Sequence, residues 1–86
     1  MKLTQAEIDE AKQHLFIALD EFKPLPKTHE ELVEMLRDYF SDQQVEVFSK
    51  MVADIGESDF RDFIANTVVE SGKYFRDDRG QVRVVE

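Results

Sequence analysis

The 86-residue sequence predicts a mainly α fold, a compact bundle of about four helices followed by a short C-terminal β-hairpin. Two observations predict the helices. Apolar residues recur at helical spacing, and Thr or Ser stands three residues before Glu or Gln at three of the expected helix starts. A third observation predicts the hairpin, because the last residues are rich in β-branched and aromatic side chains. We expect residues 1–86 to form one domain, since so short a chain encloses one modest core.

The first helix is expected over residues 4–22. Thr4 and Glu7 form a capping box, in which each side chain accepts a hydrogen bond from an otherwise unpaired backbone N–H. Pro24 and Pro26 should end this helix, because the residue before a proline avoids helical backbone geometry. Its inner face repeats with helical period through Ile8, Ala11, Leu15, Ala18, Leu19 and Phe22.

Three further helices are expected over residues 28–40, 42–55 and 58–71. Thr28 with Glu31 and Ser41 with Gln44 repeat the capping-box pattern, and glycines at 56 and 72 are expected helix stops. The residues expected on the inner faces are Leu32, Met35, Leu36, Tyr39 and Phe40, then Val45, Phe48, Met51, Val52 and Ile55, then Phe60, Phe63, Ile64, Thr67 and Val68.

Residues 73–85 are expected to form the hairpin, with a turn over the sequence Asp77-Asp78-Arg79-Gly80. A lone two-stranded hairpin is marginally stable in water. We therefore expect this hairpin to lie on the helices or to pair with another chain.

Charge and composition exclude several classes of function. The chain has 11 Lys and Arg against 19 Asp and Glu, a net charge of −8, and no basic stripe that would bind nucleic acid. The same sign disfavours anionic membrane surfaces, and the longest apolar run, from Leu15 to Leu19, is too short to span a membrane. With no Cys and no signal-peptide pattern, the sequence predicts a soluble cytoplasmic protein.

Catalytic and metal-binding patterns do not emerge from the sequence. His14 and His29 lack the spacing of paired metal ligands, the serines lie outside nucleophile motifs, and no glycine-rich loop could hold a phosphate. We therefore expect no enzyme activity, no metal and no cofactor. A deep pocket holding His14 or His29 with a carboxylate would instead favour an enzyme.

Some apolar residues lie off the expected inner faces. Phe16 and Ile17 fall away from the main stripe of the first helix, and Val47 and Val69 fall off theirs. A helix that is apolar on two sides is either sandwiched in the fold or faces a partner. Three explanations stay open: the hairpin covers these residues, a second copy of the chain does, or a different protein does.

The sequence therefore favours a non-enzymatic acidic protein-interaction module, a small inhibitor or regulator of a protein partner, and its charge suits a basic partner. The expected apolar anchors are Phe16, Ile17, Tyr74 and Phe75, and the expected steering acids are Asp54, Glu57, Asp59 and Asp62. The first alternative is a homodimeric structural or assembly component of bacterial or phage type. A more distant alternative is a DNA mimic, in which acidic side chains occupy the place of phosphates.

Overall fold

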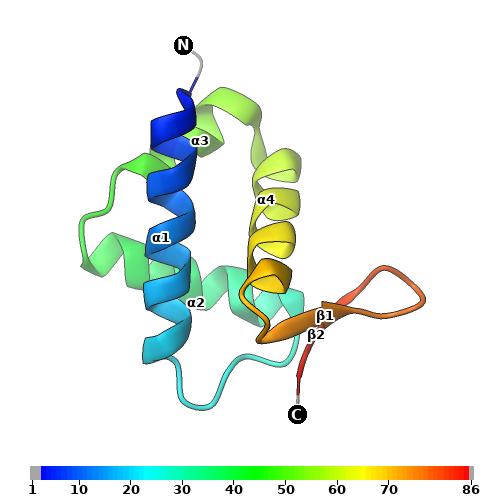
Figure 1. Ribbon diagram of the computed structural model, residues 1–86. Helices are drawn as coiled ribbons and strands as arrows, with labels where there is room; N and C mark the ends of the chain where they lie inside the picture. The colour runs from blue at the N-terminus through cyan, green and yellow to red at the C-terminus, as the bar shows by residue number, and fades with distance from the viewer. Residues whose placement is uncertain (1–2, 86) are drawn as a thin grey trace.

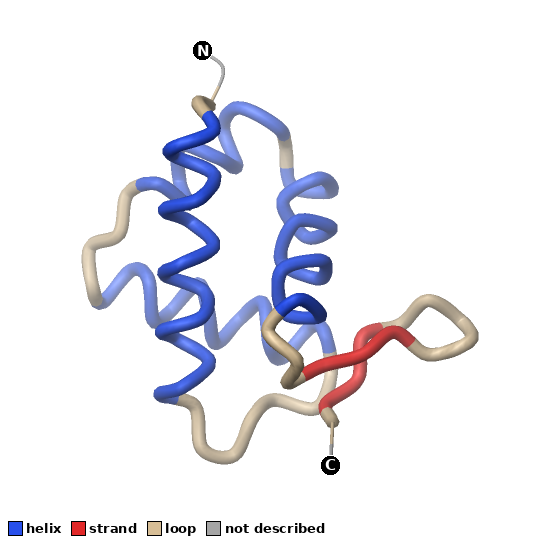
Figure 2. Tube along the Cα trace, viewed as in Figure 1, coloured by secondary structure: helices blue, strands red, loops and turns tan. Residues whose placement is uncertain are grey.

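The computed structural model describes residues 3–85 and confirms the expected fold class, four packed helices followed by an antiparallel hairpin (Figure 1). The helices are α1 (Gln5–Glu21), α2 (His29–Asp42), α3 (Val47–Ile55) and α4 (Glu57–Glu70), and the strands are β1 (Tyr74–Arg76) and β2 (Val82–Val84). In Figure 1, α1 and α4 stand side by side and α2 crosses behind their lower ends. The hairpin projects from the lower end of α4, on the side away from α1 (Figure 2). No helix within residues 3–85 is long and apolar enough to cross a membrane.

One core cluster joins all four helices to the hairpin. The rings of Phe40 and Phe48 stack with their centroids 3.8 Å apart, and Phe60 meets Phe48 edge-on at 6.1 Å. Burial of one such large apolar side chain stabilises a fold by about 1.5–3 kcal/mol. The other buried apolar residues of the helices are Ala11, Leu15, Ala18, Leu19, Leu32, Val33, Leu36, Val47, Met51, Ile64, Ala65 and Val68.

The expected start of α1 is confirmed in detail. The Thr4 hydroxyl accepts a hydrogen bond from the Glu7 N–H at 3.2 Å, and the Thr4 N–H donates to the Glu7 carboxylate at 3.1 Å. Of the second expected box, the described residues contain one half only, the Glu31 N–H donating to the Thr28 hydroxyl at 3.2 Å. Both helices therefore begin where the capping residues predict.

The expected third capping box is wrong. Ser41 lies inside α2, which continues to Asp42, and α3 begins at Val47 rather than at residue 42. The Gln44 N–H donates to the Ser41 carbonyl at 3.2 Å, and the Val45 N–H donates to the Phe40 carbonyl at 2.9 Å. With Gln44 at a φ of 56°, this is a Schellman motif, which ends a helix rather than starting one.

The inner faces of α2 and α3 differ from those expected from the sequence. Met35 and Ile55, both expected inside, are exposed, whereas Val33 and Val47 are buried. Because α3 starts later than expected, its first turn places Val47 beside Phe48 against the core. Val69, also expected off its stripe, packs partly buried against the core cluster.

A single residue, Gly56, joins α3 to α4. Its φ of 89° and ψ of 166° lie in a region that glycine alone occupies readily. The Gly56 N–H donates to the Val52 carbonyl at 2.9 Å, and its own carbonyl accepts from the Phe60 N–H at 3.0 Å. Gly56 is thus the expected stop of α3 and also the first residue that bonds into α4.

The hairpin packs on α4 and on the loop between α1 and α2. In the register, Tyr74 faces Val84, Phe75 faces Arg83, and Arg76 faces Val82. Tyr74 and Val82 are buried, so the face opposite to them carries Phe75 and Arg83 outward. Of the two expected positions for the hairpin, lying on the helices is the one observed.

Candidate interaction surfaces

Two of the four expected apolar anchors, Ile17 and Phe75, are accessible. Ile17 is 53% exposed on α1, so the hypothesis that the hairpin covers it is wrong. Phe75 is 44% exposed on the outer face of β1, directly across from Arg83. Either side chain can contact another molecule without any change in the fold.

Phe16 is only partly buried on α1. Lys12 and Asp20 lie one helical turn before and after it. The Lys12 ammonium pairs with Glu70 at 3.4 Å, and the Asp20 carboxylate pairs with Lys73 at 3.2 Å. Two ion pairs therefore flank Phe16 and hold the end of α4 and the start of the hairpin beside it.

Tyr74 is not an accessible anchor, contrary to the sequence-based expectation. It is 2% exposed, and its hydroxyl donates to the Pro26 carbonyl at 2.7 Å. Burial raises the pKa of this phenol from 10.0 to about 12, because the charged form would lose its hydration. Tyr74 therefore ties the hairpin to the α1–α2 loop instead of facing a partner.

The acids expected to steer a partner are divided by the fold. Asp54 accepts a hydrogen bond from the Leu3 N–H at 3.1 Å, and Glu57 pairs with Arg37 and, at 3.8 Å, with Arg61. Asp59 and Asp62 are exposed, and Asp62 lines a cavity described below. The cluster is therefore partly neutralised by internal contacts.

A denser acidic surface lies on the outward side of α2, and sequence reasoning missed it. We call its four residues, Glu31, Glu34, Asp38 and Asp42, the acidic face. All four are exposed, and none has an ion-pair partner within residues 3–85. Their spacing of three, four and four residues, which places side chains on one helix face, is the signal that would have revealed it. The opposite side of α2 is buried, so the fold holds these acids outward.

An apolar groove runs along the α1–α2 loop, beside the start of the acidic face. Its volume is about 570 Å³, and we call it the loop groove. Its apolar lining consists of Phe22, Pro24, Leu25, Pro26 and Met35, and Met35 is 38% exposed. Acidic and basic side chains both border it: Glu21 and Glu31 come from the helices, and Lys23 and Lys27 from the loop. The groove can accept an apolar side chain between charged edges.

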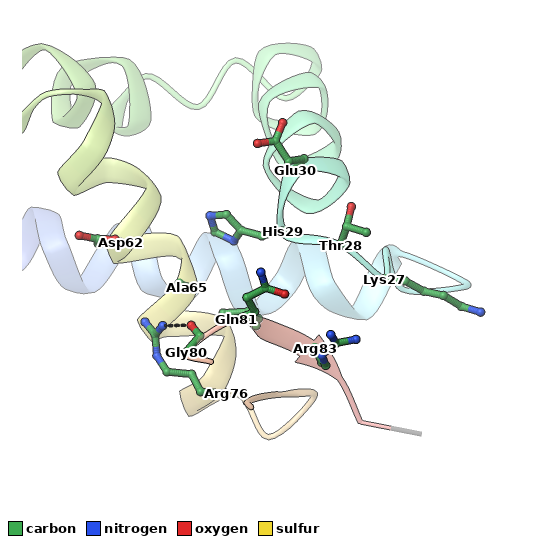
Figure 3. Close-up of a pocket in the computed structure, with 11 residues that line it drawn as sticks. Lys27, Thr28, His29, Glu30, Asp62, Ala65, Arg76, Gly80, Gln81 and Arg83 are labelled. Atoms are coloured by element: carbon green, nitrogen blue, oxygen red, sulfur yellow. Dashed lines mark hydrogen bonds between the residues drawn. The ribbon is translucent and has the colours of Figure 1, made fainter. Parts of the chain in front are cut away.

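A more polar cavity of about 520 Å³ opens between the first turn of α2, α4 and the hairpin (Figure 3). Among the side chains that line it are His29, Glu30, Asp62, Arg76 and Gln81. The Arg76 guanidinium is held at its edge by the Gly80 carbonyl at 2.9 Å and the Asn66 side chain at 2.7 Å.

His29 places an imidazole in this cavity near two carboxylates, the combination that would favour an enzyme. Burial and the positive charge of Arg61 lower its pKa. Its Nδ1 is buried without a hydrogen-bond partner among the described residues, so neither carboxylate orients the ring through that atom. The Thr28 hydroxyl, which also lines the cavity, accepts a hydrogen bond from the Glu31 N–H as the cap of α2. The cavity therefore brings together an imidazole and two carboxylates, with no hydrogen bond to the ring Nδ1 within residues 3–85.

Residues 3–85 contain no group of three or more His, Asp or Glu side chains placed to hold a metal ion. No protein-family model matches the chain, and neither a curated protein nor a solved structure is similar to it. The surfaces described above are therefore the basis for a functional proposal.

Proposed function

We propose that this chain is a non-enzymatic protein-interaction module, a small inhibitor or regulator that binds a basic surface of a protein partner. The observation that supports the proposal most is the acidic face of α2, four exposed carboxylates without an ion-pair partner within residues 3–85. Protein surfaces usually intersperse both signs of charge, so a one-sign helix face favours a partner of the opposite sign.

The buried side of α2 contributes to this function by fixing the geometry of the acids. Leu32, Leu36 and Phe40 anchor the helix in the core. The carboxylates are therefore presented at a constant spacing, which reduces the conformational entropy lost on binding. Met35, exposed on the same helix, supplies an apolar contact next to the acids. In such an interface, the apolar contact supports affinity and the acids accelerate association.

The proposal is tested by affinity capture with charge-reversed variants. The double variant Glu34→Lys/Asp38→Lys removes half of the acidic face, and Asp9→Lys/Glu10→Lys on α1 is its matched control with the same change in net charge. We expect a basic protein from the source cells to be retained by the parent chain and by the control, and to be lost from the α2 variant. Circular dichroism verifies that both variants keep their helices.

Binding of the captured protein, once purified, is then measured by stopped-flow at low and physiological salt. The association rate should fall steeply with added salt for the parent chain and little for the α2 variant. A third variant, Asp59→Lys/Asp62→Lys, tests the acids first expected from the sequence. Equal retention of the partner by the α2 variant and the parent chain would refute a role for the acidic face.

A further inference from the structure

A second surface, formed by the α1–α2 loop and the hairpin, carries charge of a different pattern from the acidic face. We call it the loop end of the bundle. Of the 11 Lys and Arg in the chain, six lie in these two segments. They are Lys23, Lys27, Lys73, Arg76, Arg79 and Arg83. Lys73 and Arg83 form ion pairs, and the other four form none within residues 3–85. The loop end is therefore rich in basic residues although the net charge of the chain is −8.

Exposed apolar surface gathers at the same end. Phe75 projects from the outer face of the hairpin, and a cavity of about 400 Å³ beside it is lined by Phe75, Lys27, Arg83 and Val84. Lys27 also lines the loop groove, so the hairpin's outer face and the groove are neighbours. This end of the bundle thus presents an apolar projection, Phe75, next to an apolar recess.

Charge is divided between the two ends of the loop. Glu21 ends α1 at one end of the loop, and Lys27 lies near the other end, where it lines a cavity together with hairpin residues. Both side chains are exposed, and neither has an ion-pair partner within residues 3–85. A two-fold rotation about the middle of the loop exchanges these ends, so that Glu21 of one copy meets Lys27 of the other.

We propose that the loop end is a self-docking surface, through which a second copy of this chain binds by two-fold symmetry. The Phe75 ring of each copy enters the loop groove of the other, and Glu21 faces Lys27 across both halves of the contact. In an isologous contact of this kind, each residue pair occurs twice, once in each half of the interface.

The overall charge selects this end as the place for self-association. Two chains of net charge −8 repel each other, and contact between their acidic faces would increase that repulsion. The loop end combines unpaired basic residues with the groove's acids, so two copies meet there with complementary charge. The loop groove shares Glu31 and Met35 with the interface proposed above, whereas Glu21, Lys27 and Phe75 lie outside that interface. Variants at these three positions therefore test self-docking separately from the proposed function.

The test is sedimentation equilibrium of the full chain and of two single variants, Glu21→Lys and Lys27→Glu. Each substitution suits its own helix, since it places a base at the end of α1 or an acid before the start of α2. Circular dichroism of each variant verifies that its helices are kept, so that loss of association is read separately from unfolding. We expect the parent chain to dimerise, and each variant alone to dimerise at least about tenfold more weakly, because like charges then meet twice.

Mixing the two variants in equal amounts is the decisive measurement. In the mixed dimer, the lysine introduced at position 21 of one chain faces the glutamate introduced at position 27 of the other. In the second half of the contact, the unchanged Lys27 of the first chain faces the unchanged Glu21 of the second. We expect the mixture to recover the parent chain's dimerisation. Glu10→Lys, on the surface of α1 outside the loop end, is the charge-matched control for Glu21→Lys and should dimerise like the parent chain.

The proposal also predicts that Phe75→Ser dimerises more weakly while circular dichroism shows an unchanged fold, because Phe75 is 44% exposed. A parent chain that stays monomeric at millimolar concentration would overturn the proposal. A dimer unaffected by Glu21→Lys and Lys27→Glu, or a mixture that fails to associate, would overturn it as well. None of these results bears on capture by the acidic face.

Discussion

Replacing Tyr74 with Phe tests how the hairpin is attached to the bundle. The Tyr74 hydroxyl donates to the Pro26 carbonyl at 2.7 Å, and Pro26 is buried. Tyr74→Phe keeps the ring and removes only this donor, which leaves the carbonyl without its partner. We expect the free energy of unfolding at pH 7 to fall by about 1–3 kcal/mol, the cost of one unsatisfied buried polar group.

The same variant has a pH dependence of known sign. The pKa of Tyr74 is raised from 10.0 to about 12 in the folded chain. The stability gained from the neutral phenol is therefore complete below pH 10 and is lost as the pH rises towards 12. At pH 11 the loss amounts to about 1.4 kcal/mol for a shift of this size. Tyr74→Phe has no phenol to ionise and does not lose this stability. The difference in the free energy of unfolding between the parent chain and Tyr74→Phe should therefore be smaller at pH 11 than at pH 7 by that amount.

Urea unfolding followed by circular dichroism at pH 7 and pH 11 measures both quantities. Tyr39→Phe is the matched control, because Tyr39 is only partly buried and its hydroxyl forms no hydrogen bond within residues 3–85. The difference between the parent chain and Tyr39→Phe should be small at both pH values. If the difference between the parent chain and Tyr74→Phe is the same at both, the folded state does not shield the Tyr74 hydroxyl, and the reasoning is refuted.

Three further predictions concern single positions. Gln44→Gly should stabilise the chain by about 0.5–1 kcal/mol in urea unfolding, because glycine adopts a positive φ without steric cost; a loss of stability would contradict the Schellman assignment. Ile17→Glu should change the stability by no more than about 0.5 kcal/mol, since the side chain faces solvent, and a large loss of helicity would place it in the core. The Arg83 side chain and the Gln81 N–H hold the pKa of Asp77 below its ordinary value of 3.8. The ionised Asp77 carboxylate therefore stabilises the turn above pH 3.8, and this stabilisation is lost as the pH falls through the lowered pKa. Amide exchange at Gln81 measures the loosening of the turn. Asp77→Asn should abolish this pH dependence.

Local signals in the sequence predict much of the fold. The Thr4 and Glu7 pair fixes the start of α1 because both partners of the cap lie within one turn of chain. The pattern of Ser41 and Gln44 has the same spacing but marks a helix end. The two cases differ only in whether the helix lies after the pattern or before it. For Ser41 and Gln44 this depends on the packing of Phe40 in the core. A short-range pattern therefore predicts a cap without always predicting which helix it belongs to.

The candidate surfaces were harder to predict, because long-range pairing decides which charges remain available. Glu57 meets Arg37 across 20 residues of sequence, and Lys50 meets Glu7 across 43. No local pattern reveals such pairs. Tyr74 and Phe75 illustrate the same limit: alternation along a strand predicts that they face opposite ways, but only the position of the hairpin on α4 decides which one is buried.

The one-residue connection at Gly56 has a consequence for how this chain can change in length. With no further linker, the rotation of α4 about its own axis is fixed by the last turn of α3. An added residue at this point would change the direction and rotation with which α4 leaves α3, which would displace Phe60 and Ile64 from their places in the core. The connection from Gln43 to Glu46 has room to absorb such a change. Insertions between α2 and α3 should therefore leave the fold intact, whereas insertions between α3 and α4 should destabilise it.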